Sequence, residues 1–287
     1  MSMLRFKQVD VFTRVPFRGN PVAVVLGAEG LETSQMRRIA NWTNLSETTF
    51  VLPPGAAGAD YRLRIFTPRA ELPFAGHPTI GSAHAALEAG VVAPRNGTLR
   101  QECGAGTIEL RVDDGRLWLK APPARVSPLE AGRMADLARV LGAEPVGAPL
   151  VVDVGPVWLV ADVGSAETLA KLAPDMGALG RFTEAAGTTG ITAFGAASDG
   201  VSALHVRSFA PAHGIPEDPV CGSGNISVAA YLSRSRLLER YGAGYTARQG
   251  MQLGRDGQVS IRIGEGGAAI ELGGYAVTCV EGTLRVD

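Results

Sequence analysis

The chain has few of the features that define several common protein classes. It contains only three cysteines among 287 residues, an odd number at wide spacing and without a CxxC pair, which argues against a disulfide framework and a thiolate zinc site. No stretch approaches the roughly 18 apolar residues of a membrane span, and the opening residues lack the apolar core of a signal peptide. We therefore expect a cytoplasmic protein in a reducing compartment.

Charge is balanced and dispersed. The formal net charge is −1 with no run of like charges, so the chain has no basic footprint for nucleic acid or an anionic membrane. His84, His205 and His213 show no metal-ligand spacing and are assigned to packing or to the surface. With 46% apolar residues, the chain can bury one or two cores. We expect a small-molecule partner and no metal.

An internal repeat is the most informative feature of the sequence. Residues 64–68 (Arg-Ile-Phe-Thr-Pro) precede 76–78 (Gly-His-Pro), and residues 207–211 (Arg-Ser-Phe-Ala-Pro) precede 221–224 (Cys-Gly-Ser-Gly). A second echo follows in the same order and is formed by residues 99–101 (Leu-Arg-Gln) and 247–249 (Ala-Arg-Gln). The preserved order predicts two homologous halves, and a cleft between such halves is a usual place for a small ligand.

Predicted strands far outnumber predicted helices. Period-2 and short apolar patterns predict strands at residues 6–12, 22–26, 48–52, 61–66, 99–102, 107–112, 116–120, 150–154, 157–161, 191–194 and 204–209. The segments 80–87 and 226–232 are small or apolar around most of a helix circumference, which is typical of a helix surrounded by protein. We expect an α+β fold in which a mostly antiparallel sheet wraps around a central helix in each half.

The boundary between the halves is predicted near a proline-rich break. Residues 121–125 (Ala-Pro-Pro-Ala-Arg) interrupt the strand pattern, and 127–130 (Ser-Pro-Leu-Glu) read as a capping box with proline at the first helical position. The expected helix buries a stripe formed by Leu129, Met134, Leu137 and Leu141. This divides the chain into residues 1–121 and 122–275.

The two repeated motifs place glycines at helix starts. Backbone N–H groups in the first turn of a helix have no internal partner and bind anions, so Gly76 and Gly222 leave these ends open to a carboxylate. The alternative is that the glycines only turn the chain tightly into the helix. A dinucleotide or phosphate loop is disfavoured, because its further glycine and its Gly-Lys-Ser/Thr are missing. Two such ends on one carboxylate could stabilise an enediolate without a cofactor.

Three segments carry a family resemblance. Residues 44–50 (Asn-Leu-Ser-Glu-Thr-Thr-Phe), 74–81 (Phe-Ala-Gly-His-Pro-Thr-Ile-Gly) and 217–223 (Glu-Asp-Pro-Val-Cys-Gly-Ser) resemble the phenazine-biosynthesis PhzF family, and the likeness spans the whole chain. The resemblance implies the diaminopimelate epimerase-like fold, an active site in the cleft between two quasi-symmetric halves, and a homodimer. It also implies that the C-terminal strand, residues 276–287, crosses back to the first half.

The resemblance implies which residue moves a proton. In the PhzF family a glutamate does so in the isomerisation of a cyclic hydroxylated amino acid, and Glu47 matches that position. A partly desolvated glutamate has a raised pKa, which suits it to accept and return a proton near neutral pH. The alternative, from the sequence alone, is a surface residue beside a strand.

The resemblance also names residues that position the substrate. His77 and Asp218 could shuttle a proton or orient the substrate, while Ser223 and the Gly76 backbone hold substrate oxygens. Two further residues, Asn20 and Gly222, match positions that bind the substrate. A purely structural role stays open for two of these residues: His77 could cap its helix, and Asp218 before a proline is a common turn residue.

Cys221 departs from the family pattern, which usually has threonine there. The segment 221–224 resembles the second cysteine motif of diaminopimelate epimerases and proline racemases, and a thiol at a helix start would have a lowered pKa and could act as a base. Those enzymes use two thiols, and the equivalent residue in the first half is Ala75. A two-thiol mechanism is therefore excluded, whereas a pair formed by Glu47 and Cys221 stays open beside a packing role for Cys221.

The sequence thus predicts a cofactor-independent isomerase that moves a proton on a small, carboxylate-bearing, amino-acid-derived substrate, with Glu47 as general acid and base. One rival is an epimerase, racemase or dehydratase of a cyclic amino acid that uses Cys221 with Glu47. A rival of another class is a family member that binds a ligand or a protein without catalysis.

Overall fold

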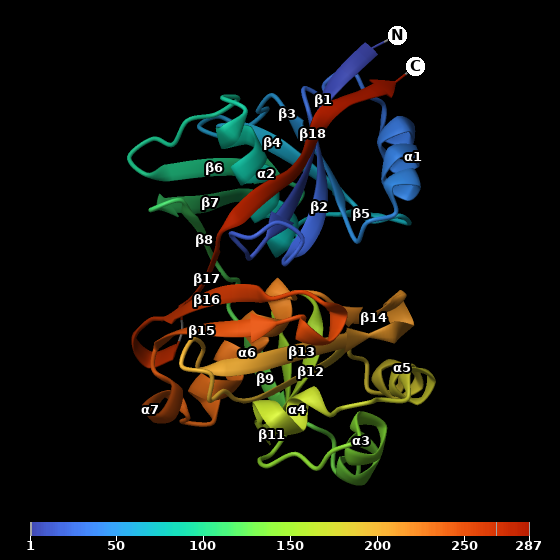
Figure 1. Cartoon of the computed structure of the whole chain (residues 1–287), viewed down its shortest axis with the longest axis vertical. Helices are drawn as coiled ribbons and strands as arrows, with labels where there is room; N and C mark the ends of the chain where they lie inside the picture. Colours follow the sequence, from blue (N-terminus) through green and yellow to red (C-terminus); the bar gives the residue numbers. More distant parts are fainter. Residues whose placement is uncertain (1, 268, 287) are drawn as a thin grey trace. The chain divides into compact units, whose positions relative to one another are not determined.

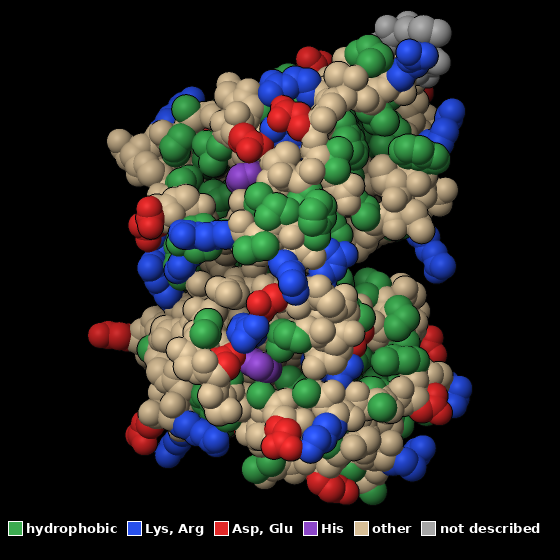
Figure 2. Space-filling view, in the orientation of Figure 1, with side chains coloured by type: hydrophobic (Ala, Val, Ile, Leu, Met, Phe, Trp, Pro, Cys, Tyr) green, Lys and Arg blue, Asp and Glu red, His purple; other side chains and the backbone are tan. Residues whose placement is uncertain are grey.

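Two compact units make up the chain. The computed structural model describes residues 2–267 and 269–286. Unit 1 comprises Met1–Leu119 and Gly273–Asp287, and unit 2 comprises Lys120–Leu272. None of the helices within the described residues has the length and apolarity that a membrane crossing requires. On the face shown in Figure 2, basic and acidic side chains lie interspersed over the surface of each unit.

Unit 1 is a mixed sheet around one helix (Figure 1). Its elements are β1 (Ser2–Val11), β2 (Asn20–Leu26), α1 (Thr33–Thr43), β3 (Thr48–Leu52), β4 (Tyr61–Phe66), β5 (Glu71–Leu72), α2 (Gly76–Glu88), β6 (Thr98–Cys103), β7 (Gly106–Asp113), β8 (Arg116–Lys120) and β18 (Ala276–Val286). The strands pair in the order β18, β1, β2, β3 and β4, after which β4 pairs with both β5 and β6, and β6 leads on to β7 and β8. Only β2 with β3 and β4 with β6 are parallel in this series.

Helix α2 is the centre of unit 1. It packs against β1, β2, β3, β4 and β18, and nine of its residues are buried. The small residues on its surface allow this, since a Cβ at Gly81 would lie 2.9 Å from Val11 Cγ2. The predicted helix surrounded by strands is therefore confirmed in this half.

Unit 2 repeats the arrangement. Its elements are β9 (Arg125–Pro128), α3 (Met134–Leu141), β10 (Leu150–Asp153), β11 (Val157–Ser165), α4 (Ala166–Ala170), α5 (Met176–Ala185), β12 (Gly190–Ala196), β13 (Leu204–Ala210), η1 (Pro211–His213), β14 (Ile215–Asp218), α6 (Gly222–Arg234), α7 (Leu238–Tyr241), β15 (Gly244–Gln249), η2 (Met251–Leu253), β16 (Gly257–Ile263), η3 (Glu265–Gly267) and β17 (Ile270–Gly274). The pairing order is β9, β10, β11, β12 and β13, followed by β14 and β15 beside β13 and then β16.

The two pairing orders agree strand by strand. In each unit the third and fourth strands of the series are parallel, β2 with β3 and β11 with β12. The strand before the central helix also pairs in the same way, β4 with β5 and β6, and β13 with β14 and β15. Helix α6 packs against β9, β10, β11, β12 and β16. The repeat predicted from the sequence is therefore a repeat of topology.

One predicted helix start is wrong. Ser127 and Pro128 were expected to cap a helix, but they belong to β9, where Ser127 pairs with Val151 of β10. The helix begins at Met134 instead, and Met134 is 41% exposed rather than part of the buried stripe. A strand partner 24 residues further along the chain outweighs the local capping signal, because pairing satisfies the same backbone groups that a cap would satisfy.

Candidate active site

Glu47 lies directly before β3, at a position fixed by its strand neighbours. Thr48 pairs with Ala23 of β2 in parallel register, and the carbonyl oxygen of Glu47 accepts a hydrogen bond of 3.4 Å from the Ala23 N–H. The strand itself, Thr-Thr-Phe-Val-Leu, is rich in β-branched residues, which favour a pleated, buried strand. The Glu47 side chain is 13% exposed, so it does not lie on the open surface.

His77 brings an imidazole to the carboxyl group of Glu47. Helix α2 begins after Ala75, whose extended backbone serves as the N-cap without a side-chain hydrogen bond. His77 therefore does not cap the helix, and only 8% of the residue is exposed. Its Nε2 atom lies 3.2 Å from Oε2 of Glu47. The structure thus brings together two of the three residues predicted to act in catalysis.

The environment of Glu47 changes its proton affinity. Burial raises the pKa of the carboxyl group from its ordinary value of 4.5 to about 7, although a hydrogen bond with the Ser46 side chain acts in the lowering direction. Within the described residues, Oε2 of Glu47 is buried and makes no hydrogen bond. A carboxyl group with a pKa near neutrality is half ionised at pH 7, which is the condition for both accepting and returning a proton.

Gly76 precedes His77 at the start of α2, and Asn20 is the first residue of β2. A Cβ atom at Gly76 would meet nothing within 4 Å, and its φ angle lies outside the left-handed region. Neither crowding nor a left-handed turn therefore requires glycine here. Asn20 begins β2 opposite Val11 of β1 and is 1% exposed.

The start of α6 in unit 2 is capped by the side chain of Cys221. Cys221 is the N-cap, and its Sγ atom accepts a hydrogen bond of 3.3 Å from the Gly224 N–H. Burial raises the pKa of the Cys221 thiol far above its ordinary value of 9, and the nearby carboxyl group of Asp218 adds to the effect. The expectation of a lowered thiol pKa is therefore wrong, because desolvation of the thiolate outweighs the hydrogen bonds with Ser223, Gly224 and Ser208 that act in the lowering direction.

The remaining predicted residues lie around the same helix start. Oδ1 of Asp218 accepts a hydrogen bond of 3.0 Å from the Val220 N–H. This is the geometry expected of the alternative in which Asp218 is a turn residue. Ser223 is half-buried, and its hydroxyl oxygen accepts a hydrogen bond of 3.0 Å from Nε1 of Trp158. Gly222, between them, is buried and is the first residue of α6.

Two glutamines that were not predicted as site residues hold the helix starts. Oε1 of Gln249 accepts from the Cys221 N–H at 3.1 Å, and its Nε2 donates to the Asp218 carbonyl at 3.0 Å. In unit 1, Nε2 of Gln101 donates to Oγ1 of Thr79 in α2 at 3.0 Å. Both glutamines are fully buried. The signal was present in the second echo of the repeat, where Arg-Gln recurs.

Strand register identifies the residue of unit 2 that is equivalent to Glu47. Thr48 faces Phe66 in unit 1, and Ile191 faces Phe209 in unit 2, so the residue before each is equivalent: Glu47 and Gly190. A Cβ at Gly190 would overlap the carbonyl oxygen of Phe209 and lie 2.7 Å from the Trp158 ring. Unit 2 therefore has no room for a counterpart of Glu47.

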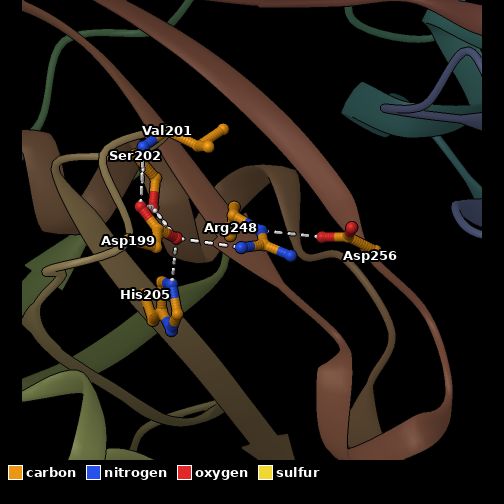
Figure 3. A network of polar contacts seen from close by, with 6 residues as sticks. All are labelled: Asp199, Val201, Ser202, His205, Arg248 and Asp256. Carbon is orange, nitrogen blue, oxygen red and sulfur yellow. Dashed lines mark hydrogen bonds and ion pairs between the residues drawn. The ribbon is translucent and has the colours of Figure 1, made fainter.

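His205 has a structural role outside the candidate site. His205 of β13 contributes to the network in Figure 3, in which Asp199 also accepts from Ser202 and from Nη1 of Arg248, while Nε of Arg248 donates to Asp256 at 2.8 Å. Burial alone would raise the pKa of Asp199, but these hydrogen bonds lower it well below its ordinary value. No cluster of three or more potential metal ligands occurs in the described part of the chain.

Comparison with known proteins identifies the family. The phenazine biosynthesis-like protein family (PhzC-PhzF) matches residues 9–282. The chain is 40% identical to the Schizosaccharomyces pombe protein antisense-enhancing sequence 1, over 98% of this chain and 99% of that protein. It is 37% identical to a trans-2,3-dihydro-3-hydroxyanthranilate isomerase of Pseudomonas fluorescens, over 96% of this chain and 97% of that enzyme.

A solved structure agrees with the sequence matches. The PhzF-family protein of Bacillus anthracis superposes with a TM-score of 0.87 at 24% identity, covering 100% of both chains, which confirms the predicted α+β fold. The chain therefore belongs to the PhzC-PhzF family of phenazine biosynthesis-like proteins, and it is an isomerase.

Proposed function

We propose that the enzyme relocates a proton on a small, cyclic, amino-acid-derived carboxylate, with Glu47 as the general acid and base. The observation that carries this proposal is the buried Glu47 carboxyl group, with a pKa of about 7 and His77 Nε2 at 3.2 Å from its Oε2. The relatives named trans-2,3-dihydro-3-hydroxyanthranilate isomerases supply the substrate to test first, and the reaction needs no cofactor.

The reaction balances as an isomerisation. The Glu47 carboxylate accepts a proton from a substrate carbon, the electron pair of that C–H bond forms a new double bond, and the electron pair of the existing double bond moves to the far carbon, where it will bond the returning proton. The Glu47 carboxylic acid then returns the proton to the far carbon, so that composition is unchanged. In this proposal His77, held in the first turn of α2, positions the carboxyl group between these two steps and donates to charge that develops on the substrate.

The helix starts supply the binding groups in this proposal. The Gly76 N–H, at the start of α2, binds a substrate oxygen in unit 1, and Asn20 contributes a further binding group. Ser223 and the Gly222 N–H bind the substrate in unit 2, and Asp218 orients it. That both halves act on one substrate in a cleft, and that the enzyme is a homodimer, stay predictions. Sedimentation velocity measures the latter.

The rival that uses Cys221 with Glu47 has less support. A thiol whose pKa is raised by burial has little thiolate at neutral pH and is a poor base. Its Sγ atom is also occupied as an acceptor for the Gly224 N–H. The non-catalytic rival is disfavoured by the contact between Glu47 and His77, since a binding module has no need for a carboxyl group tuned to neutrality.

Exchange in deuterated water tests the proposal. With trans-2,3-dihydro-3-hydroxyanthranilate as substrate, proton NMR follows product formation and deuterium uptake at carbon. We expect Glu47→Gln to lower turnover by about 10³-fold, whereas Glu109→Gln, at a side chain that is 62% exposed, leaves it unchanged. Full turnover in Glu47→Gln would overturn the assignment of the base, and absence of turnover in the unmodified enzyme would overturn the substrate class.

A further inference from the structure

Trp158 of β11 makes one polar contact that the reaction does not by itself explain. Its indole Nε1–H donates to the Ser223 hydroxyl oxygen at 3.0 Å, across 65 residues of sequence. Trp158 is 4% exposed, while Ser223 is half-buried between the buried Gly222 and Gly224. The contact therefore joins a fixed interior side chain to the one residue of these three that retains access to solvent.

The indole ring has little freedom to move. Trp158 pairs in register with Gly190 of β12, and a Cβ at Gly190 would lie 2.7 Å from Cζ3 of the ring. The ring thus covers the space above a residue that has no side chain. By strand register the equivalent of Trp158 in unit 1 is Val22, beside the position of Glu47. In unit 1 the small Val22 lies beside the larger Glu47, whereas in unit 2 the large Trp158 lies beside Gly190, which has no side chain.

The direction of the hydrogen bond decides what Ser223 can do. A serine hydroxyl has one hydrogen and two acceptor sites, and an indole can only donate. Because one acceptor site is occupied by Trp158, the hydroxyl hydrogen points away from the ring. The Cys221 Sγ atom lies 3.5 Å from the hydroxyl oxygen, in a contact in which either atom can donate, and a thiol is only a weak donor and a weak acceptor. The hydrogen is therefore available to a stronger acceptor.

We propose that Trp158 is a positioning residue that makes the Ser223 hydroxyl a dedicated donor to a substrate oxygen. This inference rests on the proposed function, in which Ser223 binds the substrate. A carboxylate or hydroxyl oxygen of the substrate then replaces the weak sulfur contact, and a donor already turned toward it loses less rotational freedom on binding. The residue acts on substrate affinity through Ser223 and does not touch the reacting carbon.

A double-mutant cycle with trans-2,3-dihydro-3-hydroxyanthranilate tests the inference. Trp158→Phe keeps an aromatic ring and removes the donor, so KM is expected to rise about tenfold with kcat nearly unchanged. Ser223→Ala is expected to raise KM at least as much, and Trp158→Phe should add nothing in that background. Trp42→Phe, at a side chain that is 76% exposed, is the matched control. Multiplying effects in the double variant, or an unchanged KM in Trp158→Phe, would overturn the inference.

A second measurement does not depend on turnover or on the folding of Trp158→Phe. In enzyme labelled with 5-fluorotryptophan, the ¹⁹F signal of Trp158 should shift in Ser223→Ala and return in Ser223→Thr, while the Trp42 signal stays fixed. Addition of 3-hydroxyanthranilate, the aromatic analogue without the labile C–H bond, should also shift the Trp158 signal. An unmoved Trp158 signal in both experiments refutes the inference even if Glu47→Gln is inactive. Conversely, an active Glu47→Gln refutes the proposed base without moving this signal.

Discussion

The starts of α2 and α6 occupy equivalent places in two units of the same topology, yet their chemistry differs. The first presents a buried carboxyl group and an imidazole, Glu47 and His77, with a pKa near neutrality on the carboxyl group. The second presents a hydroxyl group, Ser223, which accepts from an indole, and a thiol that caps its own helix. In the proposed reaction, one half therefore supplies the proton carrier and the other supplies binding groups.

What the halves share is structural. Arg64 makes two hydrogen bonds of 2.7 Å to Glu71 in unit 1, and Arg207 makes equivalent bonds of 2.9 and 2.8 Å to Glu217 in unit 2. Such two-pronged pairs fix geometry as well as adding energy. Since these pairs recur on both sides, they belong to the common frame, and function is to be sought where the repeat departs from itself.

The largest expected effect tests whether unit 2 can hold a side chain at the position of Glu47. Gly190→Ala places a Cβ against the Phe209 carbonyl oxygen and 2.7 Å from the Trp158 ring. Backbone cannot move aside as a flexible side chain can, so we expect a loss of at least about 3 kcal/mol in the free energy of unfolding, measured by urea denaturation. Gly76→Ala, in open space, is the control and should stay within about 1 kcal/mol. Equal stability of the two variants would remove the steric basis of the comparison.

The next effect concerns the partner of Glu47. His77→Leu removes the imidazole 3.2 Å from the carboxyl group, and we expect kcat to fall about 10²-fold. The pH profile of kcat/KM should rise through a midpoint near 7 in the unmodified enzyme, because the ionised carboxylate is the proposed base. That midpoint should move upward in His77→Leu, since a carboxylate that loses a polar neighbour is harder to ionise. The exposed His213 provides a control in His213→Leu, and a midpoint that stays in place in His77→Leu would contradict the assigned contact.

A third effect is the loss of folding stability that the raised pKa of Glu47 causes. The pKa of Glu47 is about 7 in the folded state against an ordinary 4.5, so the folded protein holds the proton more tightly than the unfolded chain. The cost is absent below pH 4.5, grows as pH rises from 4.5 to 7, and is complete above that range. Glu47→Gln is neutral throughout and should therefore be more stable than the unmodified enzyme by roughly 3 kcal/mol at pH 8, with little difference at pH 4.5. A gain that is independent of pH, from urea denaturation at both values, would argue against ionisation as its cause.

The repeat in the sequence was sufficient to predict the fold of each half, because the strand pattern and the central helix can be recognised in each half separately. The capping box at residues 127–130 misled because the decisive contact, the pairing of β9 with β10, is not local. Helix α5 (Met176–Ala185) was missed, since its residues include Gly177 and Gly180 and only four of them are buried. Local propensity decides an element only where tertiary pairing does not compete with it.

At the site, the sequence predicted residue types better than their environments. The sequence predicted Glu47 and His77 as site residues, and the raised carboxyl pKa of Glu47 agrees with the predicted desolvation. For Cys221 the predicted direction of the pKa shift was wrong, because the sequence shows a helix start but not the burial of the thiol. Trp158 was missed because its partner lies 65 residues away and nothing local marks it.

The smallest expected effect distinguishes two roles of Cys221, as the N-cap of α6 or as a catalytic base. A serine hydroxyl accepts the Gly224 N–H as the sulfur does, and serine is a preferred N-cap residue. Cys221→Ser should therefore keep kcat within about threefold and the free energy of unfolding within about 1 kcal/mol, whereas Cys221→Val loses the cap and should be less stable by about 1 kcal/mol. If carbon-bound deuterium uptake vanished in Cys221→Ser while Glu47 remained in place, the thiol would be a second proton carrier, and the division between a reacting half and a binding half would no longer hold.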